Sequence, residues 1–138
     1  MPDKHYVTVK AAIAKDGKLL LQKELSDGVE VYSMPGGRID EGEDPIAGLR
    51  REVMEEIGVT VSAISPLPIK VYTAHNGRNS FVTLVYKATL DSETFRYDTS
   101  RTREVESAAF VDKPTLATSS PYYQTPYIIR YFDEFIKD

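Results

Sequence analysis

The chain has no cysteine among its 138 residues and no long apolar run. Without cysteine, neither a disulfide framework nor a thiol-based metal site can form. A membrane helix needs about 18 consecutive apolar residues, and no segment approaches that length. The N-terminal segment, Met1–His5, lacks the apolar core that a signal peptide requires. We therefore expect a cytoplasmic protein with no membrane partner.

Excess positive charge is also missing. The net charge is −4, and seven of the 21 acidic residues lie between Asp40 and Glu56. With Arg50 and Arg51 included, this segment has a balance of −5, so the rest of the chain carries about +1. Such a chain lacks the broad basic face that is expected of a nucleic-acid binder. It can still bind a small anionic ligand, provided that a metal ion bridges the ligand to the carboxylates.

The length fits one domain, residues 1–138, without room for a second core. Composition and alternation of apolar residues predict strands at residues 6–14, 18–23, 59–64, 69–74, 81–90 and 104–111. Asp16 and Gly17 predict a hairpin turn, and residues 26–32 a loop or a short strand. The segment 81–90 is mostly apolar, so we expect it to be central in the sheet.

Two helices complete the prediction. In the first, Asp44 can cap the start, Pro45 fits the first turn and Gly58 ends the helix. Its buried stripe is expected at Ile46, Leu49, Val53 and Ile57. The second begins at a cap formed by Thr125 and Pro126, and its apolar side holds Tyr127, Ile128, Tyr131, Phe132, Phe135 and Ile136. With a mixed β-sheet between helices, the elements predict an α/β fold of α/β/α layers.

Three glutamates form a second face of the first helix, at Glu52, Glu55 and Glu56. Because residues three and four apart are neighbours on a helix, these carboxylates repel one another. Arg51 can pair with Glu55, which leaves Glu52 and Glu56 without an obvious local partner. Mg²⁺ or Mn²⁺ would supply one, since hard cations bind carboxylate oxygens. The alternative is the solvated acidic face of an ordinary amphipathic helix.

The wider pattern from residue 37 to residue 59 favours the metal site. Its fixed positions hold Gly37, Glu43, Arg51, Glu52, Glu55, Glu56 and Gly58, with apolar Val53 and Val59. This spacing matches every fixed position of the Nudix box, so the chain resembles the Nudix (MutT-like) hydrolases. The resemblance implies a Nudix-type α/β/α sandwich, with a mixed β-sheet between helices.

The resemblance also implies a role for residues of the box. Glu52, Glu55 and Glu56 would bind Mg²⁺, for which Mn²⁺ can substitute, together with the backbone carbonyl of Gly37. Arg51 would hold and orient one of these carboxylates, and Glu43 would support the site. The implied reaction is attack by water on the phosphoanhydride of a nucleoside diphosphate linked to another moiety, which releases a nucleoside monophosphate.

Several alternatives stay open. The general base is Glu52 or Glu55 within the box, or else Glu104 or Glu106 beyond it. A different function is a catalytically inactive Nudix-fold sensor that binds a nucleotide or a sugar phosphate. Such sensors often lose glutamates of the box, and this chain has lost none. A homodimer is plausible from the family resemblance.

In the family that the chain resembles, residues outside the box determine which substrate is bound. Ala74 and His75 occupy the place of the proline found in many ADP-ribose hydrolases, which weakens that interpretation. Asn76 and Gly77 stand where many diadenosine polyphosphate hydrolases have tyrosine, which weakens that one as well. A nucleoside triphosphate or a nucleotide sugar is then the expected substrate. Its candidate contacts are Arg38, Tyr72, Arg78, Arg101 and Arg103, although these residues could instead belong to mobile polar loops.

Overall fold

The computed structural model describes residues 4–97 and 105–137, which form two β-sheets and four helices. The larger sheet is mixed, with the strand order β5 (Gly36–Arg38), β1 (His5–Ala12), β8 (Ser80–Leu90) and β6 (Val61–Ile64), and with β7 (Lys70–His75) also paired to β8. The smaller sheet is antiparallel and contains β2 (Ala14–Lys15), β3 (Lys18–Ser26), β4 (Val29–Ser33) and β9 (Val105–Val111).

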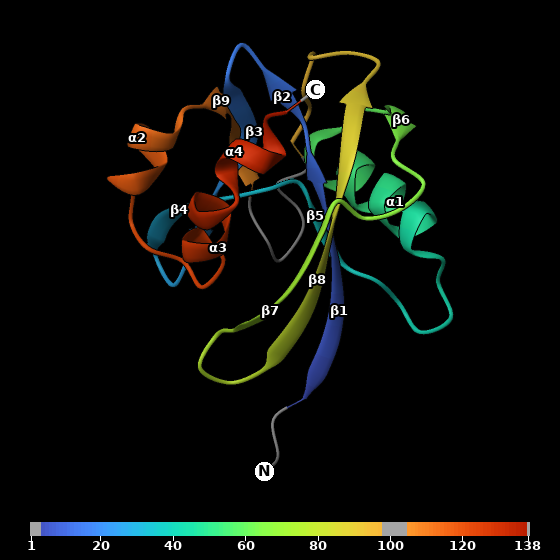
Figure 1. Ribbon diagram of the computed structural model, residues 1–138, viewed down its shortest axis with the longest axis horizontal. Helices are drawn as coiled ribbons and strands as arrows, with labels where there is room; N and C mark the ends of the chain where they lie inside the picture. Colours follow the sequence, from blue (N-terminus) through green and yellow to red (C-terminus); the bar gives the residue numbers. More distant parts are fainter. Residues whose placement is uncertain (1–3, 98–104, 138) are drawn as a thin grey trace.

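Helices cover the strands from two sides (Figure 1). One side carries α1 (Pro45–Ile57) alone, and the other carries α2 (Lys113–Ala117), α3 (Thr125–Arg130) and α4 (Phe132–Phe135). The central position predicted for the apolar segment 81–90 is confirmed, because β8 pairs with β1, β6 and β7. The β1–β8 pair is parallel, whereas the other pairs of this sheet are antiparallel.

Two hydrophobic cores fill the spaces between these layers. On the α1 side, Leu49, Val53 and Ile57 are fully buried, as their spacing predicts. On the other side, the second core contains Ile128, Phe132 and Phe135. The three consecutive leucines of β3 serve both cores, since Leu20 belongs to the first and Leu19 and Leu21 to the second. Because side chains alternate along a strand, β3 is buried on both of its faces. The α/β/α layering is therefore confirmed.

The ends of α1 follow the sequence prediction. Asp44 caps the helix by accepting a hydrogen bond from the backbone N–H of Ala47 at 3.0 Å. Gly58 ends it in the left-handed conformation, with φ at 69°. A Cβ at this glycine would also lie 2.8 Å from Cβ of Arg96. Both the conformation and the close approach of the chain therefore require glycine here.

The predicted C-terminal helix is wrong in two respects. It is interrupted at Tyr131, whose φ of −105° leaves the helical region and separates α3 from α4. The residue at the N-cap is Gln124 instead of Thr125. The hydroxyl of Thr125 already accepts a hydrogen bond from the backbone N–H of Tyr122, which fixes the chain before the helix. Of its apolar side, Ile128, Phe132 and Phe135 are buried, and the other members are half-buried.

Two further segments add detail to the prediction. Residues 26–32 divide into the end of β3, a turn and most of β4, because Asp27 and Gly28 both take positive φ and reverse the chain. The sequence analysis also missed α2, although Asp112 caps it by accepting from the backbone N–H of Thr115. A five-residue helix is too short to produce a recognisable apolar period, which explains the omission.

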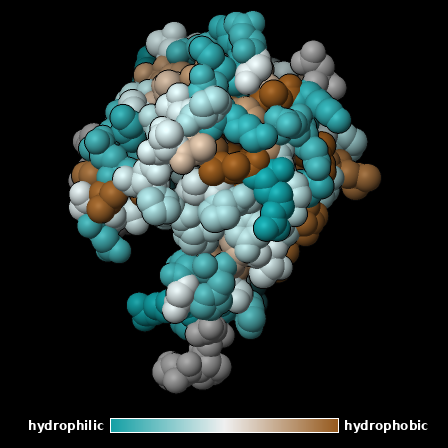
Figure 2. Space-filling view, turned by 60° about the vertical axis from the view of Figure 1, so that its left-hand side comes forward, coloured by the Kyte–Doolittle hydropathy of each residue, from teal (hydrophilic) through white to brown (hydrophobic). Residues whose placement is uncertain are grey.

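The outer surface on the side of α2–α4 is mainly hydrophilic or neutral, with separate hydrophobic patches (Figure 2). Tyr123, Tyr127 and Tyr131 on this side are half-buried. Within the part of the chain that the structure describes, no helix combines the length and the apolar character needed to cross a lipid bilayer.

Candidate active site

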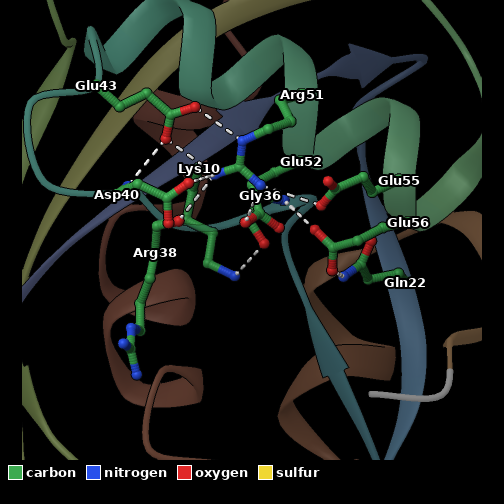
Figure 3. Close-up of polar contacts among 10 residues, drawn as sticks. All are labelled: Lys10, Gln22, Gly36, Arg38, Asp40, Glu43, Arg51, Glu52, Glu55 and Glu56. Atoms are coloured by element: carbon green, nitrogen blue, oxygen red, sulfur yellow. Dashed lines mark hydrogen bonds and ion pairs between the residues drawn. The ribbon is translucent and has the colours of Figure 1, made fainter. Parts of the chain in front are cut away.

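Arg51 lies at the centre of the acidic face of α1 (Figure 3). Its guanidinium donates two hydrogen bonds to Glu43, from Nε to Oε2 at 2.8 Å and from Nη2 to Oε1 at 2.9 Å. A third nitrogen, Nη1, donates to Glu52 Oε1 and to Glu55 Oε2, both at 3.1 Å. The predicted pair of Arg51 with Glu55 is therefore present. The prediction that Glu52 has no local partner is wrong, because Arg51 donates hydrogen bonds to three carboxylates, that of Glu52 included.

The electrostatics of this cluster follow from these bonds. The hydrogen bonds from Arg51 and from the backbone N–H of Asp40 lower the pKa of Glu43 to about 2. In return, the hydrogen bond to Glu43 and the charges of Glu52 and Glu55 raise the pKa of Arg51. The arginine thus offsets part of the carboxylate repulsion. Glu43, which lies before the helix, takes the role of an anchor for Arg51.

Glu56 has different surroundings from the other two glutamates. Its side chain is buried, with the whole residue 6% exposed. The amide Nε2 of Gln22 on β3 donates to Glu56 Oε2 at 2.5 Å, and the backbone N–H of Gly36 donates to Oε1 at 3.1 Å. The sequence analysis left Glu56 without a local partner because both of these donors come from strands distant in the chain.

The two glycines of β5 let the backbone approach α1 and β1 closely. A Cβ at Gly37 would lie 2.6 Å from Glu52 Oε2, so the carboxylate of Glu52 rests against this strand. Gly36 has φ at 135°, and a Cβ there would lie 2.0 Å from the carbonyl oxygen of Val9. Neither position accepts a larger residue without a shift of its neighbours.

Lys10 is a buried residue of this region that the sequence analysis missed. Its ammonium donates to the carbonyls of Met34 at 3.1 Å and Gly36 at 3.3 Å, and the residue is 3% exposed. The available signal was its place in β1, where Lys10 alternates with the buried Val9 and Ala11. A lysine inside such a strand needs buried acceptors, and the backbone of Met34 and of Gly36 in β5 supplies them.

Within residues 4–97 and 105–137, no three side chains of histidine, cysteine, aspartate or glutamate converge as a metal-binding group. The donor chemistry nevertheless fits a hard divalent cation, since Glu52, Glu55 and Glu56 all offer carboxylate oxygens on one helix face. The missing Cβ of Gly37 also leaves the space that the carboxylate of Glu52 occupies. These residues are therefore suited to hold such an ion.

Two of the predicted substrate contacts, Arg38 and Tyr72, have partners other than the carboxylates. The side chain of Arg38 points away from them, with its guanidinium 3.8 Å from the ring centre of Tyr6 (Figure 3). Tyr72 is 7% exposed, and its hydroxyl donates to Gln124 Oε1 at 2.6 Å. Burial raises the pKa of Tyr72. It lies in β7, in agreement with the strand predicted at residues 69–74, and not in a loop.

The remaining candidates are spread over the chain. Arg78 lies in the exposed turn between β7 and β8, where its backbone N–H donates to Asn76 Oδ1. Glu106 is exposed on β9. Three others, Arg101, Arg103 and Glu104, lie outside the described residues.

Comparison with known proteins points to one family. The family model of the NUDIX domain matches residues 4–126. The chain is 36% identical over 75 residues to the nucleoside diphosphate-linked moiety X motif 6 protein of Xenopus laevis. The aligned segment covers 53% of this chain and 35% of that protein. It is also 38% identical over 61 residues to the 8-oxo-dGTP diphosphatase of Haemophilus influenzae. This second aligned segment covers 41% of this chain and 45% of that protein. The match thus spans less than half the length of each relative.

A solved structure supports the same fold. The MutT protein from Methanosarcina mazei Go1 superposes with a TM-score of 0.77, covers 99% of both chains and has 18% sequence identity. At that identity the likeness concerns the fold alone.

Proposed function

Because this chain belongs to the Nudix family, we propose that it is a metal-dependent hydrolase of a nucleoside diphosphate linked to another moiety. The observation that carries the proposal is the cluster on α1, where Arg51 holds Glu43, Glu52 and Glu55 beside the Gly36–Gly37 strand. Such a concentration of oriented carboxylates suits a cation that binds phosphate.

We propose that Glu52, Glu55 and Glu56 hold Mg²⁺, or Mn²⁺ in its place, with the backbone carbonyl of Gly37. When bound, this ion neutralises phosphate charge and lowers the pKa of the attacking water. Arg51 keeps two of these carboxylates in fixed positions through the Nη1 bonds, while Glu43 fixes Arg51 from its other side. Preorganised ligands reduce the conformational entropy lost on binding.

The proposed reaction is hydrolysis by water at phosphorus. A bond forms between the water oxygen and phosphorus, and the bond from phosphorus to the bridging anhydride oxygen breaks. The proton of the water passes to a carboxylate base, and the products are a nucleoside monophosphate and the remaining phosphorylated group. Glu52 and Glu55 are the candidate bases within the cluster, and Glu104 and Glu106 are the candidates beyond it.

The substrate class is a further proposal, which draws on the functions of the relatives. One of them is an 8-oxo-dGTP diphosphatase, which supports a nucleoside triphosphate, including oxidised forms. A nucleotide sugar is the second class. Arg38 and Arg78 are the described arginines that we propose for phosphate recognition, since a guanidinium can engage two oxygens. The buried hydroxyl of Tyr72 instead supports Gln124 at the start of α3.

Three broader expectations stay predictions: a single domain over residues 1–138, a cytoplasmic location, and a possible homodimer with no nucleic-acid partner. No described contact favours the sensor alternative over hydrolysis.

A product-resolved hydrolysis screen with Mg²⁺ and Mn²⁺ tests the proposed function. It covers nucleoside triphosphates, oxidised nucleotides, nucleotide sugars, ADP-ribose and dinucleoside polyphosphates. The control is Glu55→Gln, which removes the charge at nearly constant volume. We expect metal-dependent release of a nucleoside monophosphate from one class, and loss of that release in the variant. Full activity of folded Glu55→Gln would contradict the assignment, and turnover of no substrate would favour the sensor.

A further inference from the structure

Gln22 is a buried polar residue to which the proposed mechanism gives no role. It is 0% exposed and lies on β3, whose neighbours β4 and β9 fix it from both sides through the pairs with Ser33 and Ala108. Its amide Nε2 donates to Glu56 Oε2, so it links the smaller sheet to α1 across 34 positions of the chain (Figure 3). The linked carboxylate is one of the three proposed metal ligands.

Packing by itself does not account for an amide at this position. The other end of the side chain, Gln22 Oε1, has no hydrogen-bond partner, and neither has the buried hydroxyl of Ser33, its register partner. A buried polar atom without a partner costs free energy that an apolar side chain of the same length would not. The bond to Glu56 is therefore the interaction that an apolar residue, such as methionine, would lose.

Two of the donors to Glu56 differ in kind from the donor that Glu52 and Glu55 share. Arg51 holds Glu52 and Glu55 with a positive charge. The donors from Gln22 and from the backbone of Gly36 are neutral. Neutral donors fix the direction of a carboxylate without cancelling its charge, and hydrogen-bond partners of this type orient metal ligands in proteins.

We propose that Gln22 is a positioning residue, which holds the Glu56 carboxylate in the direction needed to bind the divalent cation. The inference rests on the proposed function, because it requires Glu56 to be a metal ligand. Gln22 itself touches neither the substrate nor the reacting atoms. Its contribution comes from the smaller sheet, where β3 is paired on both sides.

The test is Gln22→Met, with Mn²⁺ affinity measured by titration calorimetry in the absence of substrate. Methionine keeps the length of the side chain and removes its donor. We expect the Kd for Mn²⁺ to rise about tenfold, at the lower end of the 10–100-fold losses found for outer-shell partners of metals. At saturating Mn²⁺, the KM for a substrate identified in the screen should change less than twofold, because Gln22 does not contact it.

Ser33→Ala is the matched control, because Ser33 lies beside Gln22, is equally buried and has no hydrogen bond to Glu56 through its hydroxyl. We expect its Mn²⁺ affinity to stay within twofold of the parent. A double variant adds a second control. If Gln22 acts through Glu56, Gln22→Met combined with Glu56→Gln should bind Mn²⁺ no more weakly than Glu56→Gln does. Circular dichroism and thermal unfolding establish that each variant is folded.

The outcomes separate this inference from the function on which it rests. If Glu56→Gln leaves Mn²⁺ affinity unchanged, Glu56 is not a ligand, and the proposed metal site fails together with the inference. If Glu56→Gln weakens binding but Gln22→Met does not, the inference alone is overturned. Equal losses in Gln22→Met and Ser33→Ala would indicate a packing effect and would also overturn it. Should Gln22→Met not fold, Gln22→Asn carries the same test, because its amide is one methylene shorter.

Discussion

The two faces of the strand layers are held together by different interactions. On the α1 face, an arginine and neutral donors hold four carboxylates in fixed positions: Glu43, Glu52, Glu55 and Glu56. On the opposite face, rings pack against rings, as in the stack of Tyr72 and Tyr127, whose centres are 4.7 Å apart. Both faces bury an apolar core, and the α1 face adds this concentration of charge, at a cost in repulsion. We therefore assign the chemistry to the α1 face, whereas the opposite face contributes packing.

The largest effect on stability is expected from Phe132→Ala on the α4 side. Phe132 is 1% exposed within the second core, so truncation leaves a cavity and should cost about 3–5 kcal/mol of the free energy of unfolding. Urea unfolding measures this loss. Turnover per folded molecule should stay within about twofold of the parent. A large loss of turnover in the folded fraction would contradict the division between the two faces.

Arg51→Met should have the next largest effect, which we expect on activity and not on stability. It removes the one fork that holds Glu43, Glu52 and Glu55, so these carboxylates repel without their shared partner. We expect kcat/KM to fall at least about a hundredfold, equivalent to about 2.7 kcal/mol. Arg50→Met is the matched control, because it removes the same charge from the preceding residue, whose guanidinium bonds the carbonyl of Val61. Equal losses in both variants would point to a general charge effect.

Tyr72→Phe tests the role of a residue that was predicted to contact the substrate but is buried in the second core. Removing the hydroxyl leaves the buried Gln124 Oε1 without this donor, which should cost about 1–3 kcal/mol of unfolding free energy. Urea unfolding and steady-state kinetics should report lower stability at an unchanged KM. An increased KM at unchanged stability would restore Tyr72 as a substrate contact.

The smallest effect concerns the dependence of stability on pH. The pKa of Glu43 is lowered to about 2 from an ordinary value of 4.5, so its charged form stabilises the folded state. That contribution is fully present above the unfolded pKa and is lost as the pH falls towards 2. Glu43→Gln should therefore be less stable than the parent at pH 7, and this difference should shrink between pH 4.5 and pH 2.

Urea unfolding at several pH values measures this difference. Glu41→Gln controls for the loss of one negative charge at an exposed neighbouring position. A stability difference for Glu43→Gln that is the same at pH 7 and at pH 2 would show that the ion pair with Arg51 does not cause it.

The sequence by itself determined the features that depend on local spacing. The ends of α1, its buried stripe and the Nudix box all follow from residues close together in the chain, where capping, helical periodicity and left-handed glycine act over a few positions. The strand predicted over residues 18–23 is likewise confirmed, as part of β3.

Only the tertiary structure decided which distant residues surround these features. Gln22 and Gly36 donate hydrogen bonds to Glu56 because strands of two sheets lie against one helix. No local sequence pattern predicts these contacts. The same holds for Lys10, whose acceptors come from the backbone 24 and 26 residues further along the chain. Local propensities fix the elements over a few residues, whereas packing of apolar faces brings the elements together. The partners of each buried polar group are therefore settled when the layers close.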